Sequence, residues 1–115
     1  MDAMEPERIS AEELMRRVEG GEEFLFLDVR PKQSYRLSPV RIKGAVRVPP
    51  NDIGTRFSQL PANKPIVVYC SEPGDATAVR VVRILLDRGF RDVLVLRGGF
   101  EAWLRAGYPV EQKEN

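Results

Sequence analysis

Cys70 is the only cysteine in this chain of 115 residues, and its position is typical of a reactive thiol. It directly follows the apolar run Ile66–Tyr69, which predicts a buried β-strand, and a helical pattern begins at Ala76. A thiol between a strand and a helix lies near unpaired backbone N–H groups and the positive end of the helix dipole. Both favour the thiolate, the nucleophilic form of cysteine. The alternative interpretation is a small core residue, since free cysteines are among the most buried residue types.

The elements around Cys70 alternate between strands and helices along the chain. Apolar runs predict strands at Phe24–Leu27, Ala45–Val48, Ile66–Tyr69 and Val93–Leu96. Helices or helical turns are expected at Ala11–Glu19, from Pro31 to Tyr35, from Asn51 or Asp52 toward Leu60, from Ala76 to a point before Gly89, and at Phe100–Arg105. This alternation implies a mostly parallel sheet with helices on both faces.

Two of these helices carry strong signals. Ser10 and Glu13 form a capping box at the start of the first one. The helix after Cys70 has an apolar stripe at i, i+3, i+4 and i+7, formed by Ala78, Val81, Val82 and Leu85. Gly89 is placed to end it as the C′ residue.

In parallel sheets ligands bind outside the carboxyl ends of the strands. Asp28–Arg30, Pro49, Cys70 and Arg97 all lie at such ends. We therefore expect Cys70 at the mouth of a pocket, with Arg97 and Arg30 as candidate lining residues. Arg30 and Asp28 are also expected to tie the sheet edge to neighbouring loops.

The composition fits one soluble globular domain, with 43% hydrophobic and 30% charged residues. A net charge of +1 gives no argument for nucleic acid or an anionic membrane as partner. No apolar run approaches the roughly 20 residues of a membrane span. With one cysteine and no histidine, we expect no metal, no cofactor and no internal disulfide. We predict a cytoplasmic monomer.

Three segments are expected to lack regular structure. Residues 1–8 are predicted to be a mobile leader, residues 37–44 a basic loop, and residues 111–115 a polar tail.

The order of these features resembles a single rhodanese-like domain of the sulfurtransferase superfamily. The resemblance runs through nearly the whole chain. Ile9–Leu14, Asp28–Arg30 with Tyr35, and Val68–Cys70 each match a family segment. Ile42–Pro49 is similar to the segment that the family writes as H-I-P-G-A-x-N-x-P. The C-terminal signature is matched by Gly89-Phe90, Val93, Leu96, Gly98-Gly99, Trp103 and Gly107–Val110. Each piece alone is weak, and their order and spacing together are specific.

The resemblance implies a three-layer α/β domain over residues 9–110, with a mostly parallel five-stranded sheet flanked by helices. It also implies sulfurtransferase chemistry, in which the Cys70 thiolate takes a sulfane sulfur from thiosulfate or a persulfide and passes it to a thiol or protein acceptor. The loop after the cysteine would hold the persulfide with backbone N–H groups, and its residues are Ser71, Glu72, Pro73, Gly74, Asp75 and Ala76. Such chemistry needs no metal and no histidine base once the thiolate has formed.

The loop after Cys70 departs from the family pattern in its charge. Asp75 stands where a basic residue is often found, and Glu72 lies in the same loop. Two carboxylates raise the pKa of a nearby thiol and repel an anionic donor, so we expect weak use of thiosulfate and its improvement by Asp75→Arg. The simpler interpretations are that Asp75 is an N-cap and Glu72 a solvated charge. Ser71 either donates to the persulfide or faces water.

A second departure lies in the basic loop. Arg41 and Lys43 replace the usual histidine and proline, and the stretch from Arg36 to Arg41 is slightly longer than the common spacing. We expect these changes to alter a surface loop and to leave the chemistry unchanged.

Other functions compete with sulfur transfer. The acidic loop also fits a binding or regulatory domain with little turnover, since fold does not fix function. A phosphatase or arsenate reductase of the same superfamily needs an arginine at the sixth place after the cysteine, where this chain has Ala76. A purely redox role is weak because there is no second cysteine to resolve a disulfide.

Overall fold

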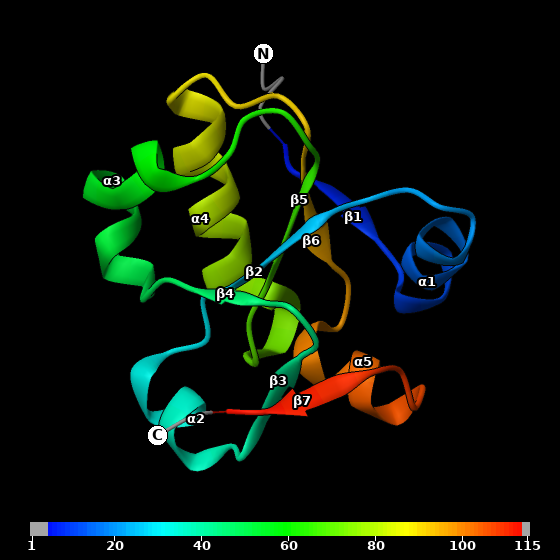
Figure 1. Cartoon of the computed structure of the whole chain (residues 1–115). Coiled ribbons are helices and arrows are strands. Elements are labelled where there is room, and N and C mark those ends of the chain that lie inside the picture. Colours follow the sequence, from blue (N-terminus) through cyan, green and yellow to red (C-terminus); the bar gives the residue numbers. More distant parts are fainter. Residues whose placement is uncertain (1–4, 114–115) are drawn as a thin grey trace.

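A five-stranded parallel sheet forms the centre of the molecule (Figure 1). The computed structural model describes residues 5–113. In spatial order the strands are β1 (Glu7–Ile9), β6 (Val93–Leu96), β5 (Ile66–Tyr69), β2 (Leu25–Asp28) and β4 (Val46–Arg47). The predicted α/β class and the five-stranded parallel sheet are therefore confirmed. No helix among the described residues is both long and apolar enough to cross a bilayer.

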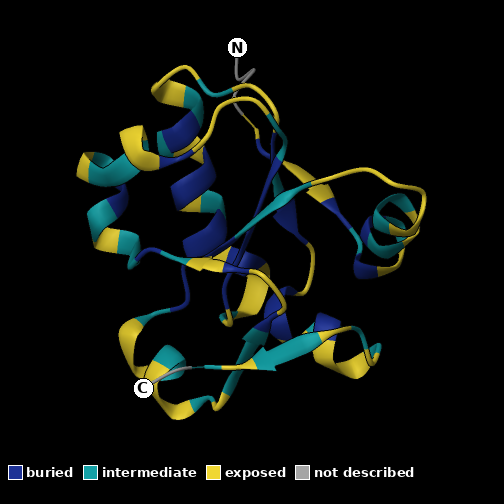
Figure 2. Ribbon diagram, in the orientation of Figure 1, coloured by how far each residue is buried: buried dark blue, intermediate teal, exposed yellow. Residues whose placement is uncertain are grey.

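The helices cover the two faces of the sheet (Figure 1). On one face lie α3 (Ile53–Arg56) and α4 (Ala76–Asp87), and on the other α1 (Ala11–Glu19) and α5 (Gly99–Arg105). Because side chains alternate along a strand, β5 supplies both cores: Ile66 and Val68 pack on the α3/α4 side, and Val67 on the α1/α5 side. Figure 2 shows the resulting band of buried residues through the middle of the molecule.

The helix signals in the sequence are confirmed. The Ser10 hydroxyl accepts a hydrogen bond from the Glu13 backbone N–H at 3.0 Å. The four residues of the α4 stripe, Ala78, Val81, Val82 and Leu85, are all fully buried. Gly89 ends α4 with φ +95°, and the backbone N–H groups of Gly89 and Phe90 bond to the carbonyls of Leu86 and Leu85, as in a Schellman motif.

Regular structure extends beyond both ends of the predicted domain, residues 9–110. Glu7 and Arg8, expected in the mobile leader, pair with β6 as part of β1. Glu111 and Gln112, expected in the polar tail, belong to β7 (Val110–Gln112). Both strands are short and lie at edges, so they lack the apolar runs by which buried strands are recognised. Residues 1–4 of the predicted leader and 114–115 of the predicted tail lie outside the described residues.

The predicted basic loop is also partly wrong. Its middle forms β3 (Val40–Ile42), which pairs with β7 in an antiparallel two-stranded sheet. Before it, the short helix α2 (Lys32–Leu37) follows Pro31 as expected. After β4, the segment toward Leu60 is helical, but neither Asn51 nor Asp52 caps it with its side chain. It is divided into η1 (Pro50–Asp52), α3 and η2 (Phe57–Gln59).

Candidate active site

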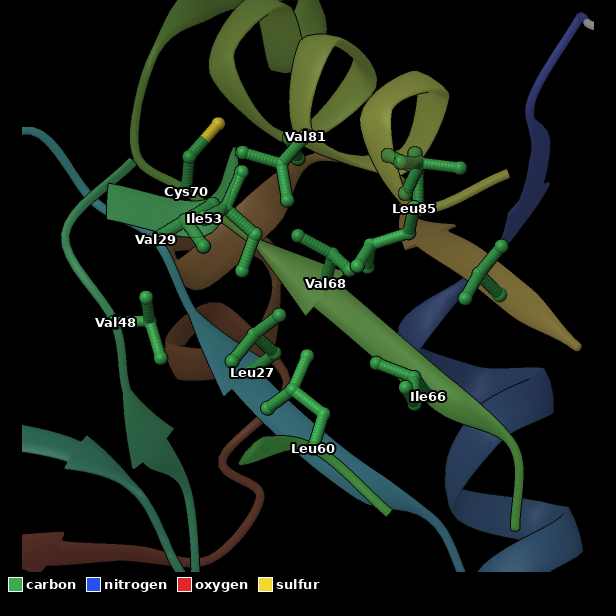
Figure 3. Packing of buried hydrophobic residues seen from close by; sticks show 14 residues of the cluster. Leu27, Val29, Val48, Ile53, Leu60, Ile66, Val68, Cys70, Val81 and Leu85 are labelled. Carbon is green, nitrogen blue, oxygen red and sulfur yellow. The ribbon is translucent and has the colours of Figure 1, made fainter. Parts of the chain in front are cut away.

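Cys70 directly follows β5, the middle strand of the sheet, at its carboxyl end. It continues the alternation of β5, so its side chain lies on the α3/α4 side with Ile66 and Val68. Figure 3 shows the sulfur pointing away from the strand toward α4 and the loop that leads into it. The residue has no exposed surface, because apolar side chains such as Ile53 and Val81 pack in the same cluster. The expected position at the mouth of a pocket is therefore wrong.

The electrostatic environment of the sulfur combines opposing effects. Burial raises the pKa of the Cys70 thiol, and this effect is the largest. The backbone N–H groups of Glu72 and Ala78 lower the pKa, while the carboxylates of Asp75 and Glu72 raise it. The net pKa is raised, contrary to the lowered value expected from the strand–turn–helix pattern. The sulfur nevertheless faces the loop and the start of α4, as that pattern predicted.

Asp75 holds the loop in place through its side chain. Gly74 and Asp75 have φ values of +70° and +58°, so two successive residues adopt the left-handed conformation before α4 begins. The Asp75 carboxylate is buried and accepts hydrogen bonds from Arg8 Nη1 at 2.8 Å and from the Gly98 backbone N–H at 3.2 Å. Asp75 occupies the N-cap position without making a side-chain cap, so that expected role is wrong. It instead links the loop to β1 and to the turn before α5.

The turn before α5 lies directly against Cys70. The Phe100 backbone N–H donates to the Cys70 carbonyl at 2.9 Å. A Cβ atom on Gly99 would lie 2.4 Å from the same carbonyl oxygen, and Gly99 has φ +59°. Only glycine fits such a close approach in this conformation. The expected role of Gly98-Gly99 as a turn is confirmed, and Gly99 has a packing role as well.

A buried charge cluster supports the strand ends beside Cys70. Arg30 is 1% exposed, and its Nη2 donates to Asp28 Oδ2 at 2.7 Å. The Tyr69 hydroxyl donates to the same oxygen at 2.8 Å, and burial beside Asp28 raises the Tyr69 pKa, which keeps that proton in place. The Arg30 guanidinium carbon lies 4.3 Å from the centre of the Phe100 ring. Arg30 thus ties the sheet edge to neighbouring segments, and its side chain is enclosed by the protein.

The other predicted residues occupy different positions. Ser71, Pro73, Gly74 and Ala76 are exposed on the loop. Glu72 is half-buried and accepts a hydrogen bond from the Thr77 hydroxyl, so it is more than a solvated charge. Arg97 is exposed at the end of β6, and its backbone N–H bonds to the Ile9 carbonyl at 2.9 Å.

Sequence reasoning missed two residues that contact this loop or its support. Arg8 pairs with Asp75 across 67 positions of sequence, and Phe100 stacks on the Tyr69 ring with centroids 5.6 Å apart. The tight Gly98-Gly99 turn indicated that Phe100 begins a helix, but no local signal connects Arg8 to Asp75.

The geometry defines a three-layer α/β protein with a cysteine loop at the carboxyl edge of its sheet. The family model described as rhodanese-like domain matches residues 10–106. The chain belongs to the rhodanese-like domain family.

Relatives extend this assignment. A sulfurtransferase of Allochromatium vinosum is 31% identical over 92% of this chain and 95% of its own length. The thiosulfate sulfurtransferase GlpE of Vibrio cholerae is 29% identical over 74% of this chain and 76% of its own length. The HTH-type transcriptional regulator Rv0324 of Mycobacterium tuberculosis is 38% identical over 90% of this chain. The chain spans only 44% of that regulator.

Solved structures agree with the family. A protein from Lactobacillus plantarum superposes with a TM-score of 0.81 at 28% identity, over 92% of this chain and 88% of its own. The rhodanese-like domain of an Anabaena protein superposes with a TM-score of 0.77 at 34% identity, over 92% of this chain and 79% of its own.

Proposed function

We propose that this protein is a sulfurtransferase that carries a sulfane sulfur on Cys70. The observation that supports this most is the place of the only thiol, at the carboxyl end of the middle strand, where the backbone N–H groups of Glu72 and Ala78 act to lower its pKa. Backbone N–H groups of this kind stabilise an anionic sulfur. Family membership and relatives named as sulfurtransferases point the same way.

The reaction has two displacement steps. The Cys70 thiolate attacks the outer sulfur of thiosulfate, a new S–S bond forms, and sulfite leaves with the electron pair of the broken bond. An acceptor thiolate then attacks the outer sulfur of the Cys70 persulfide, and the Cys70 thiolate is released. A low-molecular-weight persulfide replaces thiosulfate in the first step by the same chemistry, with its thiolate as leaving group.

The covered thiol limits the first step in two ways. The raised pKa of Cys70 leaves little thiolate at neutral pH. The sulfur has no exposed surface, so the protein around it must move before a donor can enter. We therefore expect slow turnover with thiosulfate, which is a dianion, and faster reaction with a low-molecular-weight persulfide that carries less negative charge.

Intact-mass spectrometry tests the proposal. The protein is exposed to thiosulfate or to a low-molecular-weight persulfide, and the expected result is a gain of one sulfur atom that an added thiol removes. Cys70→Ser must show no gain, because the chain has no other cysteine. A wild-type protein that gains no sulfur from either donor, at alkaline as well as neutral pH, would contradict the assignment.

A binding or regulatory role is the second candidate. Two observations favour it: the complete burial of Cys70, and the regulator Rv0324 among the relatives. In that case Cys70→Ser would leave binding to a partner unchanged.

We place the protein in the cytoplasm as a monomer without a cofactor. Sedimentation of the purified chain and fractionation of the source cells would test this.

A further inference from the structure

A strongly basic segment follows β2. Six of the 18 basic residues of the chain, and none of its 17 acidic residues, lie between Val29 and Asn51. The segment folds into α2, β3 and β4, and β3 pairs with β7, so Lys113 joins it from the far end of the chain. Sulfur transfer at Cys70 does not account for this concentration of positive charge.

The positive charges gather around one aromatic ring. Lys113 Nζ lies 3.8 Å from the centre of the Tyr35 ring, and the guanidinium carbons of Arg47 and Arg30 lie 4.1 and 5.2 Å from it. Asp28 is the acidic partner here, and it is already paired with Arg30 at 2.7 Å and lies 3.7 Å from Arg47. Positive charge is therefore in excess around this ring.

The neighbouring charges leave this excess uncompensated. Glu111, the acidic side chain on β7, is bound to Arg41 at 2.8 Å. Between residues 5 and 113, neither Arg36 nor Lys113 forms an ion pair with another residue. Lys113 Nζ donates to the Tyr35 carbonyl, and desolvation and the charge of Arg30 lower its pKa while the charge of Asp28 raises it.

This cation cluster borders a cavity of about 590 Å³. Tyr35, Arg36 and Leu37 line the cavity on the side of α2, and Gln112 and Lys113 line it on the side of β7. Arg36, Gln112 and Lys113 provide hydrogen-bond donors. Leu37 is apolar and 76% exposed. The volume lies in the range of small-ligand sites, roughly 300–1,000 Å³.

We propose that this cavity binds a small dianion of the carboxylate or phosphate class. Arg36 and Lys113 contact the two negative groups, Gln112 donates an amide hydrogen bond, and Leu37 covers the carbon atoms of an organic ligand. Arg47 and Arg30, whose guanidinium carbons lie 4.1 and 5.2 Å from the centre of the Tyr35 ring, add positive potential nearby. The site is separate from Cys70 and does not depend on sulfur transfer.

Amide NMR titration of the whole chain tests this site. Inorganic phosphate and succinate are added in separate experiments at constant ionic strength, and saturable shifts are expected at Tyr35, Leu37 and Lys113. Saturation by one probe only identifies the class of ligand, and lack of saturation by both would overturn the proposal. Because the site does not use the thiol, Cys70→Ser must bind the same probe equally well.

Variants locate the binding. Lys113→Gln removes one charged donor and is expected to weaken binding about tenfold. The matched control is Arg80→Gln, which removes one positive charge from the exposed face of α4 and should leave binding unchanged. Equal weakening by both variants would mean that only net charge matters and would overturn the site.

Two further measurements separate other occupants. Glu114 follows Lys113 in sequence, so Glu114→Gln removes a carboxylate and must bind the probe as well as or better than the wild type. Weaker binding by this variant contradicts the proposal. A short polyglutamate peptide that binds more tightly than either small anion would assign this surface to an acidic protein instead.

Discussion

Burial of the Cys70 thiol determines how this residue responds to pH. In the folded chain the pKa of the thiol is raised, because desolvation and two carboxylates outweigh the opposite effect of the Glu72 and Ala78 backbone N–H groups. The same thiol in the unfolded chain titrates near its ordinary value, about 8.5. A group with a raised folded-state pKa stabilises the fold fully below its unfolded pKa, and this stability is lost as the pH rises through the folded pKa.

The first prediction is a steep alkaline dependence of thiol reactivity. The rate of alkylation of Cys70 should still rise at pH values above about 8.5, where an ordinary thiol has reached half of its maximum. Stopped-flow alkylation over a pH series measures this rate, and the unfolded chain in urea is the control. A rate that levels off near neutral pH would show that the thiolate is stabilised after all.

The second prediction concerns the Arg8–Asp75 pair. Asp75 is 5% exposed at its side chain and Arg8 is 31% exposed. Arg8→Gln leaves a buried carboxylate without its cation and should cost about 1–3 kcal/mol of unfolding free energy. Asp75→Asn should cost less, because water can solvate the remaining guanidinium.

Asp75→Asn should also lower the Cys70 pKa, because it removes a nearby negative charge. Urea unfolding and pH-dependent alkylation of both variants measure these effects, and a larger loss for Asp75→Asn would refute the argument.

The same pair changes the expectation for Asp75→Arg. From sequence alone this change is expected to attract an anionic donor. In the folded chain Arg8 Nη1 lies 2.8 Å from the Asp75 carboxylate oxygen, so the new arginine would place a second guanidinium against Arg8. We therefore expect a loss of stability that masks any gain in thiosulfate turnover.

Among the elements, the turn between β6 and α5 fixes the position of the cysteine loop. Gly98 bonds to Asp75, Gly99 lies against the Cys70 carbonyl, and Phe100 donates to that carbonyl. The start of one helix is thus joined to the start of another through the end of β5. A substitution in this turn should therefore alter the position of the cysteine loop without a direct contact to the thiol.

The third prediction separates contact from backbone strain in this turn. Gly99→Ala places a Cβ 2.4 Å from a carbonyl oxygen in a left-handed residue, so we expect a loss of more than about 2 kcal/mol. Gly107→Ala has a similar φ of +75° with no atom within 4 Å of its Cβ. It should lose only about 1–2 kcal/mol, from the left-handed backbone alone. Thermal and urea unfolding of both variants measure the difference, and equal losses would mean that the contact relaxes freely.

Elements with dense apolar patterns were predictable from sequence, and edge elements were not. The strand at Ile66–Tyr69 and the helix start at Ala76 were predicted at their observed positions because both bury a full face. β1 buries only Ile9. β3 buries only Ile42, in a segment with several basic residues. Neither strand carries enough apolar pattern to distinguish it from a loop.

The location of the candidate site was predictable from sequence, but the burial and raised pKa of its thiol were not. The strand–loop–helix pattern placed Cys70 at the carboxyl edge, since that depends on local sequence. The burial of its thiol depends on α3 packing beside α4, and the Asp75 contacts depend on Arg8 and Gly98. These contacts join segments far apart in sequence, so no local pattern reveals them.

At the scale of the whole molecule, the central sheet and the β3–β7 pair are separate sheets. The β3–β7 sheet joins the α1/α5 side through Ile42, Val40 and Val110. β7 is further held by the Trp103 Nε1–H, which donates to the Pro109 carbonyl at 2.8 Å.

The fourth prediction is that this small sheet can be lost without loss of the central one. Removal of residues 110–115 should abolish hydrogen-exchange protection at Arg41, which pairs with Glu111, and lower the unfolding free energy. The Ile42 amide donates to the Tyr69 hydroxyl instead and should stay protected. The amides of β2, β5 and β6 should stay protected, since their partners lie within the central sheet. Amide exchange by NMR measures both sets, and a general loss of protection would show that the two sheets fold as one unit.

The chain also contains two natural reporters, one on each side of the sheet. Trp103 is the only tryptophan and belongs to the α1/α5 core, whereas Cys70 is the only cysteine and belongs to the α3/α4 core. Tryptophan fluorescence therefore senses solvent entry on one side, and thiol labelling senses it on the other, with no engineered probe. Equal opening free energies from the two signals would show that both halves of the molecule loosen together. A lower value from the thiol would identify the α3/α4 side as the one that opens first to admit small molecules.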